Sequence, residues 1–275
     1  MSRHLLFLFM LLPALAIAQA GFTRPERTGY ARFGFSTLGS SSFFTPSGLK
    51  VSSARYRDFS STFYGEYGVT NDWTAVVNFP FLRNHRLDTT SSLTALGDAT
   101  VGFRRRLLHG RTPVSVAVDF GLPTGDSQGI VAVRDTPGSD FRLPTGDGEL
   151  NTRISLFASR ALKKSKILVS AGGGYNIRTR GYTDEFSYSV TASRRLFSRL
   201  SISGNVAGLE PARPANLARS VGFGVGEGVA LVAIGGEAQY RITNRYSVSG
   251  GYIKPLRGKN LLSGGNLLFG FGISF

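Results

Sequence analysis

The chain ends in the stretch Gly265-Asn-Leu-Leu-Phe-Gly-Phe-Gly-Ile-Ser-Phe275, in which two kinds of side chain alternate. Large apolar side chains occupy one parity: Leu267, Phe269, Phe271, Ile273 and Phe275. Small and mostly polar residues occupy the other: Leu268, Gly270, Gly272 and Ser274. Successive residues of a strand point to opposite faces, so this pattern predicts a strand with one aromatic face. A soluble sheet shows the same alternation when its apolar face covers a core.

Two further features favour a membrane-spanning strand. The apolar face is aromatic up to the last residue, Phe275, and the same alternation recurs in strand after strand back to residue 28. We therefore predict an all-β fold, a transmembrane antiparallel β-barrel of about twelve strands of the bacterial outer-membrane type. The last strand is expected to pair with the first, because an open sheet edge is not tolerated in lipid. A final strand ending in Phe also resembles the signal that outer-membrane assembly machinery recognises.

The composition excludes several other classes. The 275 residues are 41% hydrophobic with a mean hydropathy of −0.01. No internal apolar run approaches the roughly 18 residues that a transmembrane helix needs. A β-barrel looks average in composition because half of each strand faces water or polar groups. Cysteine is absent, which excludes disulfides and thiolate metal sites.

The chain is strongly basic, with a formal charge of +15. Two interpretations are open: a lumen that prefers anions, or basic loops that lie among anionic lipid headgroups. Nucleic-acid binding is a weaker interpretation, because the basic residues are scattered among strands and turns. We therefore expect no nucleic-acid partner, and outer-membrane lipid and lipopolysaccharide as the surroundings.

The first twenty residues, Met1–Ala20, have the pattern of a secretory signal peptide. Arg3 and His4 form a short basic start, an apolar segment follows, and Ala18-Gln-Ala20 is a small-x-small cleavage sequence. We expect cleavage after Ala20, leaving residues 21–275 as a single barrel domain in the outer membrane. Loss of Arg3 leaves the mature chain with a formal charge of +14.

The predicted connections alternate between short and long. Tight turns are predicted at residues 70–72, 109–112, 163–165, 198–199 and 243–244. Longer loops are predicted at residues 38–50, 83–95, 123–146, 179–183, 210–219 and 256–263. Outer-membrane barrels have even strand numbers, short periplasmic turns and long outer loops. An even number also places both ends of the barrel on the periplasmic side. Residues 221–231 leave the strand count open, because they either extend a strand or belong to its loop.

Strand parity also yields candidate residues for the barrel interior. Inward-facing charged positions are Glu66, Asp98, Arg104, Asp119, Arg153, Arg195 and Glu237. One interpretation is a lattice of paired charges that braces the wall. The other is a polar constriction that selects solutes. The two roles are compatible with each other.

The longest predicted loop contains a local repeat. Leu122-Pro-Thr-Gly-Asp126 ends one strand, and Leu143-Pro-Thr-Gly-Asp147 begins the next. Pro, Gly and Asp are turn-forming residues, so the two copies predict a matched pair of bends at the barrel rim. The intervening segment, Ser127–Arg142, is a candidate plug or lid, or else a solvated outer loop. Its candidate gating residues are Gln128, Arg134, Asp140 and Arg142.

The chain resembles a known family over this hairpin. The segments concerned are Gly97–Leu107, Val116–Asp126 and Leu143–Glu149. They look like the outer-membrane family named for the MetA pathway of phenol degradation. That resemblance implies an exported transporter linked to uptake of hydrophobic or aromatic compounds, distantly similar to the fatty-acid channels. It implies no catalytic residues.

Features that would indicate an enzyme or a cofactor site are few. The three histidines are His4, His85 and His109, and the last two are predicted on opposite sides of the membrane, which disfavours a metal site. A membrane-embedded Ser-His hydrolase would need His85 on the lipid-facing wall beside a serine. The glycine clusters do not match a phosphate-binding loop. We therefore expect no enzyme activity, no cofactor and no metal.

Two functions remain. The first is a passive channel for small, hydrophobic or aromatic solutes. The alternative is a structural or surface-interaction barrel with a sealed lumen, whose basic outer loops bind lipopolysaccharide or a partner protein.

Overall fold

The computed structural model describes residues 21–162, 165–216, 220–222 and 224–275, so the predicted signal peptide lies outside the described residues. None of the described segments forms a helix long and apolar enough to cross a membrane. The strands are β1 (Gly29–Phe44), β2 (Lys50–Gly68), β3 (Trp73–Leu87), β4 (Leu93–Ala95), β5 (Ala99–Leu108), β6 (Val114–Leu122), β7 (Ile130–Ala132), β8 (Asp140–Arg142), β9 (Asn151–Leu162), β10 (Ile167–Arg178), β11 (Glu185–Arg195), β12 (Leu200–Pro211), β13 (Ser220–Gly222), β14 (Val225–Gly226), β15 (Ala230–Arg241), β16 (Tyr246–Lys259), β17 (Leu261–Leu262) and β18 (Asn266–Ser274).

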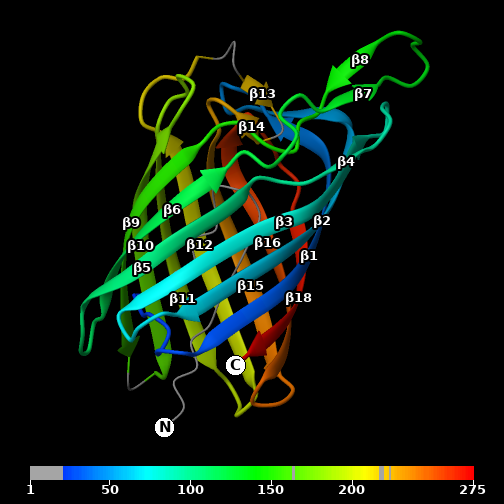
Figure 1. Cartoon of the computed structure of the whole chain (residues 1–275). Coiled ribbons are helices and arrows are strands. Elements are labelled where there is room, and N and C mark those ends of the chain that lie inside the picture. The colour runs from blue at the N-terminus through cyan, green and yellow to red at the C-terminus, as the bar shows by residue number, and fades with distance from the viewer. Residues whose placement is uncertain (1–20, 163–164, 217–219, 223) are drawn as a thin grey trace.

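Twelve of these strands form a closed antiparallel barrel, as predicted (Figure 1). The wall runs through β1, β2, β3, β5, β6, β9, β10, β11, β12, β15, β16 and β18. The last strand closes the barrel by pairing with the first over nine positions, from Tyr30↔Ser274 to Leu38↔Asn266. Closure extends to the last residue, because the Gly29 amide donates to the Phe275 carbonyl at 2.6 Å. The wall therefore has no open edge at this seam.

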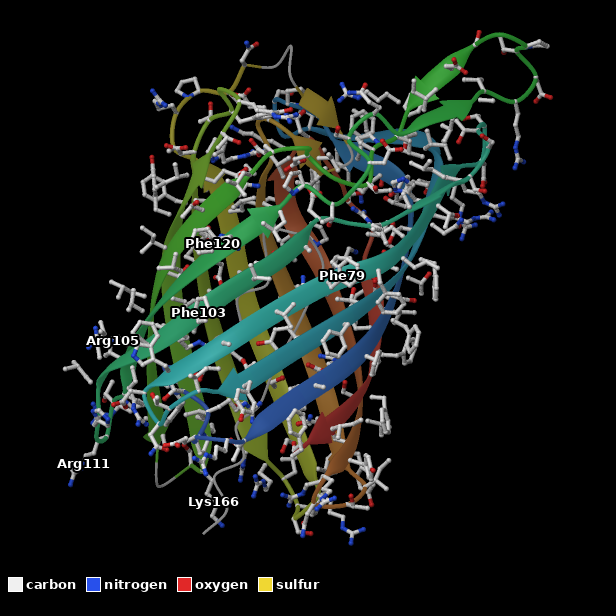
Figure 2. The ribbon with its side chains drawn as sticks, viewed as in Figure 1. Phe79, Phe103, Arg105, Arg111, Phe120 and Lys166 are labelled. Carbon is white, nitrogen blue, oxygen red and sulfur yellow. The ribbon has the colours of Figure 1, made fainter. Side chains whose placement is uncertain are left out.

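The two faces of the wall differ as the alternation predicts. Phe33, Phe269 and Phe271 are 42%, 55% and 38% exposed on the outside, whereas Leu268 of the opposite parity is buried. Figure 2 shows Phe79, Phe103 and Phe120 spread over the outer surface of the wall. Aromatic side chains also pair across strands on this face, with the Phe33 and Phe63 ring centroids 5.3 Å apart. Such an apolar outer surface is suited to lipid contact.

The two ends of the barrel are unlike each other. The connections 69–72, 109–113, 196–199 and 242–245 are short, and they lie at the end where β1 begins and β18 finishes (Figure 1). Residues 123–150 and 212–229 are the longest connections, and they lie at the opposite end. By the architecture of outer-membrane barrels, the short-turn end is periplasmic and the long-loop end is the outer end.

Three predicted loops are wrong in extent, among them residues 256–263, which contain the end of β16 and the short strand β17. Residues 38–50 are mostly strand, because β1 continues to Phe44 and β2 begins at Lys50, with Phe43 paired to Val51. Residues 83–95 likewise contain the end of β3 and the short strand β4. Serine, glycine and charged residues in these segments indicated loops, but the strands continue through them and stay paired at the outer end of the barrel. Pro80 lies at a bulge, since the β2–β3 register shifts between Ser61↔Leu82 and Phe63↔Phe79, and a proline cannot donate a hydrogen bond to the neighbouring strand.

The hairpin β7–β8 lies beside these extensions at the outer end (Figure 1). It is attached by backbone hydrogen bonds from Ser91 to the Ala132 carbonyl and from Arg134 to the Thr89 carbonyl, at 2.9 and 2.8 Å. Beneath it, an apolar cluster of Tyr56, Leu87, Val131, Leu143 and Leu262 is buried. This cluster fixes the base of the longest connection against the inner side of the extended strands.

Candidate constriction at the outer mouth

The two Leu-Pro-Thr-Gly-Asp copies lie side by side at the outer rim. The Thr145 amide donates to the Asp126 carbonyl, and the Asp126 amide donates to Thr145 Oγ1, both at 2.8 Å. In the first copy, Asp126 Oδ1 accepts the amides of Gln128 and Gly129 at 2.9 Å, which completes a turn. The repeat therefore forms the matched pair of bends that the sequence predicts, at the point where β6 ends and the chain returns toward β9.

Asp98 joins the two copies. Its carboxylate oxygens accept the amides of Gly125 and Asp147 at 2.9 and 2.8 Å. A Cβ atom at Gly146 would overlap the Asp98 carboxylate, and one at Gly125 would lie 2.9 Å from it, so glycine is required in both copies. Burial raises the pKa of Asp98, while the two amide donors partly offset this effect.

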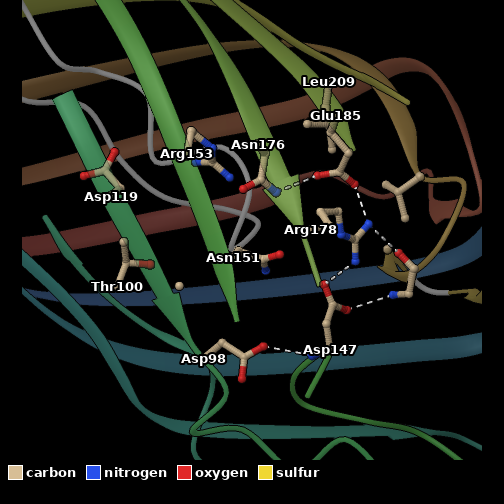
Figure 3. A pocket seen from close by; sticks show the side chains of 14 residues that line it. Asp98, Thr100, Asp119, Asp147, Asn151, Arg153, Asn176, Arg178, Glu185 and Leu209 are labelled. Atoms are coloured by element: carbon tan, nitrogen blue, oxygen red, sulfur yellow. Dashed lines mark hydrogen bonds and ion pairs between the residues drawn. The ribbon is translucent and has the colours of Figure 1, made fainter. Parts of the chain in front are cut away.

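The second copy ends in a buried charge network (Figure 3). Asp147 Oδ2 lies 3.1 Å from Arg178 Nη2, and Arg178 Nη1 lies 2.7 Å from Glu185 Oε1. Glu149 completes the set by contacting the same guanidinium. One arginine thus compensates three carboxylates. Burial raises the pKa of Glu149 to about 7, because the Arg178 charge only partly offsets the loss of water.

The connection 212–229 folds onto the same network. The Gly226 amide donates to Asp147 Oδ1 at 2.8 Å, and Arg178 Nη1 donates to the Gly226 carbonyl at 3.2 Å. Glu227 is 1% exposed and accepts from Thr183 Oγ1 at 2.6 Å. These contacts resolve the uncertain region 221–231, which belongs mainly to a loop: β13 and β14 lie within it and β15 begins only at Ala230. Two long connections therefore narrow the outer mouth together.

A cavity lies directly below these loops inside the barrel (Figure 3). Its polar side is provided by β5, β6, β9, β10 and β11, with Asp119, Arg153 and Asn176 among the residues that line it. Leu209 and Val229, which are 1% and 4% exposed, form an apolar side from β12 and the loop that precedes β15. The cavity is amphipathic and is suited to small solutes with both polar and apolar parts.

A second network lies at the periplasmic end. The Glu66 side chain is fully buried and forms ion pairs with two arginines. Its Oε2 lies 2.7 Å from Arg24 Nε, and its Oε1 lies 3.3 Å from Arg104 Nη2. Arg104 Nη1 also donates to the Phe22 carbonyl at 3.2 Å. The Gly21 amide donates to Ser159 Oγ on β9 at 2.7 Å, and β9 lies five strands round the wall from β1. Residues 21–28 therefore cross the periplasmic end of the lumen.

The predicted interior residues fall into distinct places. Asp98, Asp119 and Arg153 line the outer cavity. Glu66 and Arg104 belong to the periplasmic network, and Glu237 pairs with Arg32, whose Nη2 lies 3.0 Å from Glu237 Oε1. Arg195 is exposed at the periplasmic end of β11 and does not join the others.

The sequence prediction missed four residues of the outer network: Asp147, Glu149, Arg178 and Glu185. Parity places Arg178 and Glu185 on the inner face, at the strand ends that border the predicted loop 179–183. Asp147 and Glu149 precede β9 and carry no periodic signal. A charged residue of inward parity at or next to a predicted strand end was the sequence signal that could have identified Arg178 and Glu185.

The candidate gating residues lie apart from the constriction. Gln128, Arg134, Asp140 and Arg142 are all exposed, on or beside the β7–β8 hairpin. Arg142 Nη2 donates to the Ser127 carbonyl at 2.8 Å within that hairpin. The base of the same connection, residues 143–149, makes the contacts with the barrel interior. A gating role for the four residues stays a prediction.

The interior is acidic, although the chain is basic. Among the described residues, eight of the 17 Asp and Glu side chains are buried, but only three of the 28 Lys and Arg side chains are, since four of the 32 in the full sequence lie outside the described residues. Arg105, Arg111 and Lys166 are examples of basic residues at the exposed periplasmic end (Figure 2). An anion-preferring lumen does not follow from the net charge, because the positive charge lies mostly at the two ends of the barrel.

His85 is 1% exposed and faces the interior. Its Nδ1 lies 2.9 Å from the Tyr56 hydroxyl, and its Nε2 lies 3.0 Å from the Leu143 carbonyl oxygen. Since a carbonyl only accepts, Nε2 carries a proton. The hydrolase alternative requires His85 on the lipid-facing wall. The side chain faces the interior instead. Within the described segments, no group of three or more His, Asp or Glu side chains is placed to hold a metal ion.

Comparisons with known proteins agree with this architecture. The COG4313 outer-membrane channel from Pseudomonas putida F1 has a TM-score of 0.70 with 12% identity, over 92% of this chain and 97% of that one. The NanC porin has a TM-score of 0.54 with 10% identity, over 89% of this chain and 98% of that one. The β domain of the Bordetella autotransporter BrkA has a TM-score of 0.53 with 10% identity, over 91% of this chain and the whole of that one. No protein-family model and no curated protein matches the chain.

The class of protein follows from the closed wall, the apolar outer face and these likenesses. The chain has the fold of an outer-membrane β-barrel. At identities this low the likeness concerns the fold alone.

Proposed function

We propose that the protein is a passive outer-membrane channel whose selecting region is the cavity below the outer loops. The observation that carries this proposal is the amphipathic lining, with Arg153 and Asn176 on one side and Leu209 and Val229 on the other. A lumen built only to brace the wall would pair its charges and fill its space. Small aromatic or otherwise hydrophobic solutes with a polar group fit this lining, in line with the family resemblance of the hairpin.

The proposal is tested by solute uptake into vesicles. The leaderless chain, refolded and inserted into liposomes, is expected to admit a small aromatic alcohol faster than protein-free liposomes do, and to exclude a long oligosaccharide. Equal rates with and without the barrel would contradict a channel for such solutes. A heat-denatured sample is the matched control for protein that is present but not folded.

A sealed barrel is the second candidate, and two observations favour it. Asp147, Arg178 and Gly226 connect two loops across the outer mouth, and residues 21–28 cross the periplasmic end. In that case the outer loops would bind lipopolysaccharide or a partner protein. The same uptake assay separates the candidates, because a sealed barrel admits neither solute.

We further propose the export and assembly route that the sequence predicts. Cleavage after Ala20 would leave Gly21 as the first residue, and the strand ending in Phe275 would be recognised by the assembly machinery. Mass spectrometry of the protein isolated from outer membranes tests the cleavage site. Deletion of Phe275 tests recognition, since impaired assembly in cells but normal refolding in detergent is expected.

A further inference from the structure

We infer that the cavity below the outer loops prefers solutes with a positively charged hydrogen-bond donor over aromatic acids. The ammonium group of an arylalkylamine is such a donor. This inference rests on the proposed channel function and concerns its substrate class. The positive net charge of the chain would instead suggest a preference for anions. The argument has three parts: an unpaired acceptor, the local charge and the apolar side.

Two acceptors that line the cavity have no hydrogen-bond partner, Asn151 Oδ1 and Asn176 Oδ1, and Asn176 is the more buried residue. Asn176 is 3% exposed and lines the cavity, yet its Oδ1 has no hydrogen-bond partner (Figure 3). Its Nδ2 donates to Glu185 Oε2 at 3.2 Å. Because a carboxylate accepts and the amide nitrogen donates, the orientation of the Asn176 amide is set by Glu185, and its oxygen is left for a donor. A buried acceptor without a partner points to a missing donor.

The local charge points to the same class of solute. Four carboxylates line the cavity, those of Asp98, Asp119, Asp147 and Glu185, against the two guanidinium groups of Arg153 and Arg178. Arg178 is already engaged by Asp147, Glu149 and Glu185. Arg153 lies in cross-strand register with Asp119, so these two opposite charges are neighbours on the wall, although Arg153 Nε has no hydrogen-bond partner. An incoming anion would therefore meet an excess of carboxylates over guanidinium groups, and like charges at this range repel each other.

The apolar side limits the solute further. Leu209 and Val229 line the cavity and are almost fully buried. A small ring or alkyl group is suited to contact with these side chains, while its amine reaches the Asn176 oxygen and the neighbouring carboxylates. Such a pocket, mostly apolar on one side with a few oriented polar groups, is typical of small-molecule sites.

The test uses two probes of similar size and opposite charge, phenylethylamine and phenylacetate. Their binding to the refolded leaderless barrel in detergent is measured by isothermal titration calorimetry, which does not depend on ion flow. The amine is expected to bind at least roughly tenfold more tightly than the acid, a difference of about 1.4 kcal/mol. Phenylacetate binding as tightly as the amine, or absence of amine binding, would overturn the inference.

Two variants locate the site. Asn176→Leu keeps the side-chain size but removes the acceptor, and it is expected to weaken amine binding by roughly tenfold. Asp119→Asn removes one cavity carboxylate but keeps a hydrogen-bonding group, and it should also weaken amine binding. It provides a second test of the site if Asn176→Leu does not fold. The control is Asp88→Asn, an exposed carboxylate 3.3 Å from Arg57 outside the cavity, which should leave binding unchanged. Unchanged amine binding in both cavity variants would contradict the assignment.

The outcomes for the channel and for the inference are distinct. If the barrel conducts ions and the reversal potential shows anion preference with no amine binding, the channel stands and the inference fails. If the amine binds through Asn176 but neither ions nor solutes cross, the inference stands and the channel fails.

Discussion

The Gly226 amide donates to Asp147 Oδ1 at 2.8 Å, although the two residues are 79 positions apart in the chain. This contact connects the β6–β9 connection to the β12–β15 connection across the outer mouth. Arg178 reinforces it by contacting both Asp147 and the Gly226 carbonyl. The size of the outer opening therefore depends on an interaction between two loops and not on the wall of the barrel.

The first prediction concerns this loop contact. Asp147→Ala removes the acceptor for Gly226 and one partner of Arg178, so the two loops should separate more readily. We expect the unitary conductance in planar bilayers to rise by about twofold or more, because the narrowest part of the path widens. Deletion of residues 128–140, which removes β7, the turn and the first residue of β8 but keeps Asp147, tests the hairpin separately. A larger effect of the deletion than of Asp147→Ala would assign gating to the hairpin instead.

A second prediction concerns the periplasmic end. Removing residues 21–24 abolishes the contacts of Gly21 with Ser159 and of Arg24 with Glu66. Because this segment crosses the lumen, its removal should also raise the conductance, by about twofold. Thr23→Ala removes only a surface hydrogen bond to the Asn71 carbonyl and should have no effect. Equal conductance of the deletion and the full-length mature barrel would show that the segment does not limit flow.

The third prediction concerns pH and Glu149. Its pKa is raised to about 7 by burial, so the group is largely neutral at pH 6 and ionised at pH 8. Cation preference, measured by reversal potential, should increase over this range as the negative charge appears beside the cavity. Glu149→Gln should remove the step. The stability should also depend on pH: since the folded state binds the proton more tightly, the free energy of unfolding falls between about pH 4.5 and 7 and changes little above that.

A pH-independent reversal potential in the wild-type barrel, or a step that persists in Glu149→Gln, would contradict this assignment. Asp72 is a useful contrast in the same measurement. Its pKa is lowered, mainly by a hydrogen bond from Arg106, and it lies in an exposed periplasmic turn. Asp72 is therefore ionised throughout this pH range and contributes no step.

The fourth prediction concerns the stability of the interior. Glu66→Ala leaves Arg24 and Arg104 without their shared carboxylate, and Arg104 is 1% exposed. Breaking a buried ion pair from one side typically costs about 3–5 kcal/mol, so a loss of this size is expected in urea unfolding from lipid vesicles. Asp88→Asn, which breaks the exposed pair with Arg57, should cost less than about 1 kcal/mol. Similar losses in both variants would mean that the interior network is well hydrated.

Much of the fold was predictable because strand alternation is a local signal. In the last strand, Phe269 and Phe271 face outward and Gly270 faces inward, as the parity of the sequence requires. Closure by the pairing of Phe271 with Phe33 followed from the absence of any other way to cover a strand edge in lipid. The number of wall strands followed from counting such segments and their turns.

The site was less predictable, because it depends on contacts between distant segments. Nothing local indicates that Gly226 reaches Asp147, or that Gly21 reaches Ser159 across the lumen. Asp98 was identified by its parity, but its role in joining the two Leu-Pro-Thr-Gly-Asp copies depends on where β5 begins relative to both bends. Residues 38–50 were assigned to a loop because serine and glycine are common in loops. In the folded protein, pairing with neighbouring strands overrides that weak preference.

The most direct test of the central claim is the ion conductance of the refolded, leaderless barrel in planar bilayers. Steady unitary steps with a reversal potential that favours cations are predicted, because the lumen is proposed to be a continuous path lined by more carboxylates than arginines. Insertion of folded protein without any steps would contradict the channel. It would show instead that the loops joined through Asp147 and the segment 21–28 seal the barrel.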